Sequence, residues 1–356
     1  MKPIRVLVVD DSAYSRRSIS KMLEGMPGVE VVGYAVDGEE GIRQVISLKP
    51  DLVTLDLEMP RMDGFTLLRI LTNRFSLPVL VISALSDADK VFRALEMGAL
   101  DFVAKPIQGH ARELSSIEQD LKWKIKQIMV SLLSKKARQT APAPEADKPR
   151  KSLRSAGKRA VELVAIASST GGPPALQSIF SSFDQSYPFA VVVAQHMPHG
   201  FTRAFADRLN RTSPFTVREA HDGDPVEPGL ALIAPGGCNL LLEEVGAGIR
   251  ARVKPPEASD RYVPSADVLF TSCAPLYGSR MLAVVLTGMG NDGSKGVVAV
   301  KERGGQVLAE SEDSAVVYGM PREAVATGCV DRIVPLPGIS QAILACGGFG
   351  SPKLIL

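Results

Sequence analysis

The chain opens with an apolar run, Ile4 to Val9, which ends in Val8-Val9-Asp10-Asp11-Ser12. Further short apolar runs follow before residue 107, and amphipathic segments such as Tyr14 to Met26 separate them. The later runs are Val29 to Ala35, Asp51 to Leu55, Pro78 to Ser83 and Asp101 to Ala104. Strands that alternate with helices predict a parallel sheet with helices on both faces. We therefore expect residues 1–107 to form a doubly wound α/β domain.

A second alternating region begins at Val161 and continues to about residue 350. Its apolar runs are Leu163 to Ala167, Phe189 to Ala194, Leu230 to Ala234, Met281 to Thr287 and Gln306 to Ala309. The segment Leu240 to Val253 is interrupted by glycine and predicts a hairpin instead of a strand–helix–strand unit. Residues 161–350 are therefore expected to form a second doubly wound parallel-sheet domain, Rossmann-like in its architecture and carrying a β-hairpin.

Residues 108–160 differ in composition from both regions. A helical apolar period runs from His110 to about Lys136, and the stretch from Thr140 to Pro149 has no period and three prolines. Residues 135–159 contain nine Lys or Arg against two Asp or Glu. The composition indicates a helix followed by a solvated basic tether, and docking on an acidic partner is the alternative.

Overall composition excludes several classes of protein. The 356 residues are 45% hydrophobic and 22% charged with a net charge of +2, which is typical of globular domains. No apolar run reaches the roughly 18 residues of a membrane span, and no signal peptide is recognisable, so we expect no membrane insertion. Residues 160–356 carry 15 Lys or Arg against 19 Asp or Glu, which argues against nucleic acid as a partner. The cysteines lack CxxC spacing and are expected to be buried thiols in a reducing cytoplasm: Cys238, Cys273, Cys329 and Cys346.

Carboxylates follow the first and third strands expected in the first domain. Asp10 and Asp11 end the first strand, and Asp56 ends the third. Ligands of an open parallel sheet bind at the carboxyl ends of its strands, and carboxylates held together there repel one another unless a cation is present. Mg²⁺ suits such an oxygen-only cluster. Ser83 ends the fourth strand and Lys105 the fifth, which adds a hydroxyl and an ammonium suited to phosphoryl transfer. Taken singly, strand-end Asp and Ser residues are also common turn and cap residues.

These motifs resemble the receiver domain of two-component response regulators, a flavodoxin-like fold. The resemblance implies that Asp56 accepts a phosphoryl group from a histidine kinase. It also implies that Asp10, Asp11 and Asp56, with the main-chain carbonyl of Glu58, hold Mg²⁺. Ser83 would then be the switch hydroxyl and Lys105 the phosphate-sensing ammonium, while Phe102 falls at the family's aromatic position. The matching stretches are Val8 to Ser12, Leu55 to Gly64, Ile82 to Ala84, and Lys105-Pro106.

The first strand of the second region runs into Ser168-Ser169-Thr170-Gly171-Gly172-Pro173, after which a helix is expected. A sharp strand-to-helix turn exposes a nucleophile and directs helix amides at a reacting carbonyl. The strict G-x-S-x-G motif is absent. A phosphate-binding loop and a tight turn without chemistry are therefore alternatives.

Two further strand ends carry the residue types that would complete a catalytic triad. The strand next in sequence ends at His196, which could serve as the base for Ser169. The run that ends at Thr287 opens into a glycine-containing loop with Asp292, which could orient the histidine or cap the following helix. His199, close to His196, also allows a metal pair, but no nearby Glu or Cys supports one.

Together these segments resemble the catalytic domain of the chemotaxis protein-glutamate methylesterases of the CheB type, whose architecture is a receiver followed by this domain. The resemblance implies that Ser169 is the nucleophile, His196 the general base and acid, and Asp292 its orienting partner. It also implies an oxyanion hole from the Met289 amide and the region of Thr170. The matching stretches are Ser169 to Gly172, Gln195 to Phe201, Ala234 to Gly236, Leu286 to Gly293 and Tyr318 to Ala324.

This resemblance also sets the functional expectations. It implies hydrolysis of glutamate γ-methyl esters on methyl-accepting chemoreceptors and deamidation of receptor glutamines, with no cofactor for either reaction. The unphosphorylated receiver would inhibit the esterase, and phosphorylation of Asp56 would relieve the inhibition. Ala167-Ser168 stands where the family usually has Gly-Ala, which makes Ser168 a competitor for the role of nucleophile. A regulator that binds a ligand without catalysis and a transcriptional regulator are the remaining alternatives.

Overall fold

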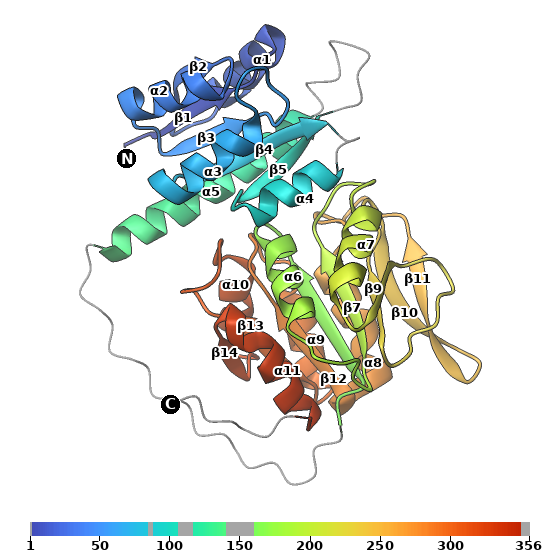
Figure 1. Cartoon of the computed structure of the whole chain (residues 1–356). Coiled ribbons are helices and arrows are strands. Elements are labelled where there is room, and N and C mark those ends of the chain that lie inside the picture. Colours follow the sequence, from blue (N-terminus) through green and yellow to red (C-terminus); the bar gives the residue numbers. More distant parts are fainter. Residues whose placement is uncertain (1, 85–87, 106–116, 140–159, 350–356) are drawn as a thin grey trace. The chain divides into compact units, whose positions relative to one another are not determined.

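The computed structural model describes residues 2–84, 88–105, 117–139 and 160–349 (Figure 1). The chain divides into two compact units, Met1–Val130 and Ser131–Leu356. Each unit contains one parallel sheet with helices on both faces. The predicted fold class, two doubly wound α/β sheets, is therefore confirmed.

The first unit has a five-stranded sheet in the order β2-β1-β3-β4-β5. Its strands are β1 (Ile4–Val9), β2 (Val29–Ala35), β3 (Leu52–Leu55), β4 (Val79–Ala84) and β5 (Asp101–Lys105). All of its neighbouring strands are parallel. The order reverses between β1 and β3, so the carboxyl ends of these two strands border the crevice in which flavodoxin-like domains bind their ligands.

The described part of this unit also contains four whole helices and the first part of a fifth. They are α1 (Ala13–Glu24), α2 (Gly38–Leu48), α3 (Gly64–Phe75), α4 (Ala88–Glu96) and α5 (Glu118–Gln139), which continues past Val130. Three of these helices begin at a capping side chain that accepts a backbone amide. Ser12 caps α1, Asp37 caps α2 and Asp63 caps α3. These caps fix where the chain leaves each strand end and so position the loops that carry Asp11 and Glu58.

The interdomain helix was predicted from His110 to about Lys136. The part of this helix that the structure describes, α5, runs from Glu118 to Gln139. The predicted first turns, including Leu114, lie outside the described residues. The predicted apolar face is present further along, since Leu121, Ile125 and Ile128 are buried.

The second unit has a seven-stranded sheet in the order β14-β13-β12-β6-β7-β9-β8. Its strands are β6 (Leu163–Ser168), β7 (Ala190–Gln195), β8 (Thr216–Glu219), β9 (Leu230–Ile233), β12 (Met281–Val285), β13 (Gln306–Glu310) and β14 (Arg332–Val334). Each pairs in parallel with its neighbours. The strand order turns back at β6, and β6 lies between β7 and β12. The carboxyl ends of these three central strands therefore meet at the topological switch point.

The helices of this unit are α6 (Gly172–Ser181), α7 (Thr202–Thr212), α8 (Ala266–Tyr277), α9 (Ser294–Glu302), α10 (Met320–Ala326) and α11 (Ile339–Gly347). A separate antiparallel hairpin, β10 (Asn239–Val245) with β11 (Gly248–Lys254), packs on α8. Leu240, Leu242 and Ala251 of the hairpin join the buried core that Phe270 and Cys273 of α8 also enter. The predicted hairpin is confirmed. The core that it completes fixes the N-terminus of α8 beside the sheet.

Two edge strands, β8 and β14, were missed by the sequence patterns. Both are short, and half of the residues or more in each are not buried, so neither has the continuous apolar run of a central strand. The cysteine prediction was wrong for three positions, because only Cys273 is buried and Cys238, Cys329 and Cys346 are partly exposed. Among the described residues, none of the helices combines the length and apolarity that a membrane span requires.

Candidate active site and phosphorylation site

Ser169 lies at the turn between β6 and α6, directly after the central strand of the second sheet. Its main-chain amide donates to the Thr287 carbonyl beyond β12 at 3.0 Å, and its carbonyl accepts the Gly172 amide at 2.8 Å. The residue is 3% exposed. These bonds fix the backbone on both sides of the hydroxyl-bearing carbon. The turn therefore presents the Ser169 hydroxyl at the switch point of the sheet.

Ser168, the competing serine, has a different environment. Its hydroxyl is fully buried and donates to Gln195 Oε1 at 2.6 Å. The Gln195 amide nitrogen in turn donates to the carbonyls of Ser169 and His196, each at 3.0 Å. The Ser168 hydroxyl thus belongs to a structural network between β6 and β7. This network holds the Ser169 turn against the His196 turn.

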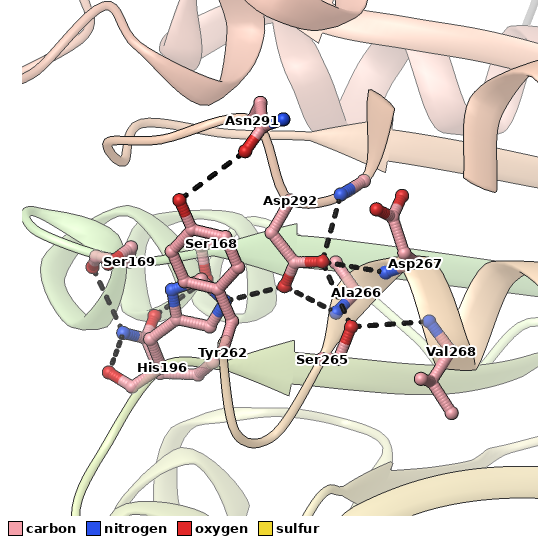
Figure 2. Close-up of polar contacts among 12 residues, drawn as sticks. Ser168, Ser169, His196, Tyr262, Ser265, Ala266, Asp267, Val268, Asn291 and Asp292 are labelled. Carbon is pink, nitrogen blue, oxygen red and sulfur yellow. Dashed lines mark hydrogen bonds and ion pairs between the residues drawn. The ribbon is translucent and has the colours of Figure 1, made fainter. Parts of the chain in front are cut away.

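His196 follows β7 and is hydrogen-bonded to Asp292, which follows β12. The His196 Nε2 atom lies 2.7 Å from Asp292 Oδ2, and the two side chains are 10% and 1% exposed. In Figure 2 the imidazole of His196 lies between Ser169 and Asp292. The structure therefore brings together the ends of the three central strands that carry the predicted serine, histidine and aspartate.

The Asp292 carboxylate is surrounded by donors from α8. Its Oδ1 atom accepts the Ser265 hydroxyl at 3.0 Å and the Asp267 amide at 2.9 Å. The Gly293 amide also donates to Oδ1, at 3.1 Å, and the Oδ2 atom accepts the Ala266 amide at 2.7 Å. An anion at a helix N-terminus is stabilised by these amides and by the helix dipole. The predicted alternative, a cap for the following helix, is not its main role, because α9 begins after Gly293.

The charges in this pair determine which nitrogen of His196 can act as a base. Burial alone would raise the pKa of Asp292, but the hydrogen bond and charge of His196 and the amides of Asp267 and Ala266 outweigh it and lower that pKa. An ionised carboxylate only accepts hydrogen bonds, so His196 Nε2 carries the proton. In a neutral imidazole with its proton on Nε2, the other nitrogen, Nδ1, is the acceptor. It is buried and has no hydrogen-bond partner among the described residues.

The loop after β12 lies against the turn that carries Ser169. A Cβ atom on residue 288 would lie only 2.8 Å from the Ser169 Cβ atom. Because Gly288 has no side chain, its backbone can lie this close to Ser169. The Thr287 hydroxyl donates to the Thr170 carbonyl at 2.9 Å. The Met289 amide, predicted for the oxyanion hole, takes part in no main-chain hydrogen bond among the residues that the structure describes. Both loops expected to bind an oxyanion are thus joined beside Ser169.

Sequence reasoning missed a buried carboxylate behind this loop. Glu310, the last residue of β13, is fully buried, and it accepts the Thr287 amide at 2.7 Å and the Ser314 hydroxyl at 2.9 Å. Burial raises the pKa of Glu310, although these two hydrogen bonds act in the opposite direction. A carboxylate at the end of a central strand was the available signal. Its role could not be read from the sequence because its partners come from distant segments.

Sequence reasoning also did not foresee the residues around His196 and Asp292. Tyr262 stacks on the His196 ring, with ring centroids 5.1 Å apart and ring planes 6° apart (Figure 2). Ser265 caps α8. A serine directly before a helix was the one feature of the sequence that could have indicated the helix N-terminus that binds the Asp292 carboxylate. His199 Nδ1 contacts the Gly236 carbonyl at 3.3 Å, and within the described residues no metal-ligand cluster includes either histidine.

In the first unit, the predicted carboxylates also converge. Asp10, Asp11 and Asp56 each offer an oxygen, and these oxygens lie within 4.8 Å of one another. The Lys105 ammonium contacts Asp10 Oδ2 at 2.8 Å and Asp56 Oδ2 at 2.5 Å. All three ligand atoms are carboxylate oxygens, and their combined negative charge exceeds the positive charge of Lys105. Such a set of oxygen ligands fits a hard divalent cation such as Mg²⁺.

Burial and charge have opposing effects on the pKa values in this cluster. Burial is the largest cause of the raised pKa of Asp10, and the charge of Asp56 adds to it against the effect of Lys105. Burial would lower the pKa of Lys105, but Asp56 and Asp10 outweigh it and raise that pKa. Lys105 therefore stays charged beside Asp56, where it can neutralise a phosphoryl group.

The remaining predicted residues of this unit differ in exposure. The Ser83 hydroxyl is buried and has no hydrogen-bond partner among the described residues, so it is available to a group bound beside it. Phe102 is 2% exposed. Glu58 has an exposed side chain paired with Lys90, and its amide contacts Asp56 Oδ1 at 3.3 Å. Glu58 therefore follows Asp56 closely enough for its main chain to border the carboxylate cluster.

Comparison with known protein families agrees with both sites. The family described as CheB methylesterase matches residues 164–343, and the response regulator receiver domain matches residues 6–116. The first match covers the segments that carry Ser169, His196 and Asp292. The second covers those that carry Asp10, Asp56 and Lys105.

Individual relatives match nearly the whole chain. The protein-glutamate methylesterase/protein-glutamine glutaminase 3 of Geobacter sulfurreducens is 54% identical, and the alignment covers 98% of both chains. The corresponding protein 1 of Myxococcus xanthus is 46% identical, with 96% of both chains covered. The crystal structure of the Thermotoga maritima CheB methylesterase catalytic domain is 39% identical with a TM-score of 0.51, covering 52% of this chain and 98% of that one.

Proposed function

Since the chain belongs to the CheB methylesterase family and carries a response regulator receiver domain, we propose that it hydrolyses glutamate γ-methyl esters on methyl-accepting chemoreceptors under the control of Asp56 phosphorylation. It is an enzyme of the protein-glutamate methylesterase/protein-glutamine glutaminase type. The observation that carries the proposed mechanism is the His196–Asp292 hydrogen bond, which engages Nε2 and leaves the buried Nδ1 without a hydrogen-bond partner among the described residues.

The proposed reaction begins at Ser169. Its oxygen attacks the γ-carbonyl carbon of the methylated glutamate while His196 Nδ1 takes the hydroxyl proton. The imidazolium then returns this proton to the departing methoxide, and methanol leaves an acyl-serine. Water attacks the acyl carbon with His196 again as the base, which gives glutamate and regenerates Ser169. A receptor glutamine follows the same path, with ammonia as the leaving group.

Asp292 and the two adjoining loops would serve the charges that develop in this reaction. Asp292 holds His196 in the tautomer with the Nε2 proton and stabilises the imidazolium. The amide of Met289, with the Thr170 turn, would donate to the oxyanion of the tetrahedral intermediate. The hydrogen bonds of Thr287 with Thr170 and Ser169 support this proposal, because they hold both loops in one arrangement before substrate binds.

Control would reside in the first unit, which we propose to comprise a receiver domain at residues 1–107. A histidine kinase would donate the phosphoryl group to Asp56. Asp10, Asp11 and Asp56, with the Glu58 carbonyl, would hold the Mg²⁺ that neutralises charge during the transfer. Lys105 and the unpartnered Ser83 hydroxyl would then contact the new phosphoryl oxygens, and this change would relieve inhibition of the esterase.

The rest of the chain would connect and complete this control. Residues 108–160 would be the helix and basic linker between the two functions, and residues 161–350 the methylesterase domain. The alternative of a ligand-binding regulator without catalysis predicts no activated serine.

The decisive experiment compares the two serines. Wild-type, Ser169→Ala and Ser168→Ala chains are treated with a fluorophosphonate probe and assayed for methanol release from methylated receptor membranes. We expect Ser169→Ala to lose labelling and at least about 10³-fold in kcat. Ser168→Ala is the matched control, because it removes only the bond to Gln195 and leaves the Ser169 hydroxyl in place. Labelling that persists in Ser169→Ala and disappears in Ser168→Ala would reassign the nucleophile.

A further inference from the structure

We infer that Tyr262 is a positioning residue, which holds the His196 imidazole at the angle that the proton transfer needs. This inference rests on the proposed hydrolase function and deepens it. Tyr262 precedes α8 in a loop that belongs to neither of the sheet edges carrying Ser169 and His196. Its side chain is half-buried and contacts the face of the base, whereas Asp292 contacts the edge.

The two contacts restrain different motions of the imidazole. The bond from His196 Nε2 to Asp292 fixes one edge of the ring, but a single hydrogen bond still permits the ring to tilt about it. A second ring that lies parallel within 6°, with its centroid at 5.1 Å, blocks tilting toward that side. The direction in which Nδ1 points is therefore set by Asp292 and Tyr262 together. A proton transfer requires this direction, because the hydroxyl must lie along the nitrogen lone pair.

Tyr262 also contacts the loop that carries Asp292. Its hydroxyl faces Asn291 Oδ1 at 3.4 Å (Figure 2). A Cβ atom on Gly290 would lie 2.3 Å from this hydroxyl, and Gly290 has a φ of +92°, so the loop has no room for a side chain here. The ring of Tyr262 thus fills the space between the imidazole and residues 290–291. One side chain connects the base to the loop proposed to supply the oxyanion donor.

The ring face is suited to the charge that His196 acquires during the reaction. A proton taken from Ser169 makes the imidazole a cation, and the face of an aromatic ring attracts a cation at this range. The stack therefore stabilises the transition state more than the resting enzyme, which is the requirement for an effect on kcat. Removal of the ring is expected to lower kcat and to leave KM nearly unchanged.

The test uses full-length chains with Tyr262→Phe, Tyr262→Leu and Tyr262→Ala. Each is assayed for the rate of covalent labelling by a small fluorophosphonate and for kcat and KM on methylated receptor membranes. The leucine and alanine variants should lose roughly 5- to 30-fold in both labelling rate and kcat, with KM within about twofold. The phenylalanine variant keeps the ring and should stay within about threefold of wild type. Leucine fills the space without a ring, so the comparison remains available if alanine destabilises the fold.

The matched control is Arg261→Ala, which should label at the wild-type rate. Arg261 is exposed, its guanidinium lies 5.5 Å from the Tyr262 centroid, and it has no contact with His196 in the described part of the chain. Wild-type labelling rates in Tyr262→Leu would overturn the inference, and a change in KM alone would assign Tyr262 to receptor docking instead. A phenylalanine variant as slow as leucine would refute stacking as the cause. By contrast, a wild-type chain whose labelling does not depend on Ser169 would refute the proposed function itself.

Discussion

Asp292→Asn is the substitution that tests the proposed proton path most directly. In the folded chain the carboxylate accepts His196 Nε2 and the amide of Ala266 on one oxygen. The other oxygen accepts the Ser265 hydroxyl and the amide of Asp267. Asparagine offers one oxygen and one NH₂ group, so it cannot satisfy all of these donors.

The structure predicts which orientation asparagine adopts. An NH₂ group in place of Oδ1 would oppose the amides of Asp267 and Gly293 and the Ser265 hydroxyl. An NH₂ group in place of Oδ2 faces only one fixed donor, the Ala266 amide, because His196 can change tautomer and accept a hydrogen bond at Nε2. The second orientation is therefore preferred. It places the proton of His196 on Nδ1, where it blocks acceptance of the Ser169 proton.

The magnitudes for activity and for stability should differ. A wrong tautomer in a serine–histidine–aspartate site lowers kcat by about 10⁴. We expect a loss of roughly 10³- to 10⁴-fold here, or about 4–5.5 kcal/mol in the barrier. The free energy of unfolding should fall by only about 1–3 kcal/mol, since one buried amide loses its acceptor.

The assay is methanol release from methylated receptor membranes, with thermal unfolding followed by circular dichroism on the same samples. Asp267→Asn is the matched control, since the Asp267 side chain accepts the Gly296 amide at 2.8 Å and asparagine can accept it equally. It should keep at least about half of the wild-type kcat. If Asp292→Asn retains more than about a tenth of wild-type kcat, the tautomer argument is wrong.

Two further predictions concern control and stability. Asp56→Ala should abolish the stimulation of ester hydrolysis by a small phosphodonor and keep basal hydrolysis. The control Asp63→Ala, which removes only the cap of α3, should still be stimulated. Equal stimulation of both variants would show that Asp56 is not the phosphorylated residue. Burial raises the pKa of Glu310 above its ordinary value of 4.5. The folded chain therefore binds the Glu310 proton more tightly than the unfolded chain does. Because the carboxyl ionises as the pH rises, the free energy of unfolding should fall with rising pH. Glu310→Gln still accepts the Thr287 amide, and its free energy of unfolding at pH 8 should exceed that of wild type by about 1–2 kcal/mol. Denaturant unfolding at several pH values should show this difference decreasing toward pH 4.5. A difference that does not depend on pH would contradict the prediction.

The central strands were predictable because their residues are buried on both faces. Ile4–Val9 and Leu163–Ser168 are almost wholly buried, and each forms within one residue of its predicted bounds. Of the edge strands, Val29–Ala35 was predicted, but Thr216–Glu219 was not, because it is short, partly solvated and similar to a loop in its pattern. The interdomain helix was predictable over its described part, because the apolar period places Leu121, Ile125 and Ile128 of α5 on one buried face.

The sequence by itself determined which residues stand at strand ends. Asp10 and Asp56 follow an apolar run directly, and Ser169 and His196 follow one after a single polar residue. Parallel strands place such positions at one edge of a sheet. This is local information, because the period of a strand and the residue that ends it are adjacent in the chain. The prediction that these side chains converge at the edge of each sheet used only this local information.

Only the tertiary structure decided how those residues are oriented. It places Ser168 in a hydrogen bond with Gln195, assigns the Nε2 nitrogen of His196 to Asp292, and surrounds that carboxylate with the amides of α8. Tyr262 and Glu310 join the site from segments that no local pattern connects to it. The physical reason is that hydrogen bonds and ring contacts depend on the packing of distant segments, which the pattern within one segment does not encode.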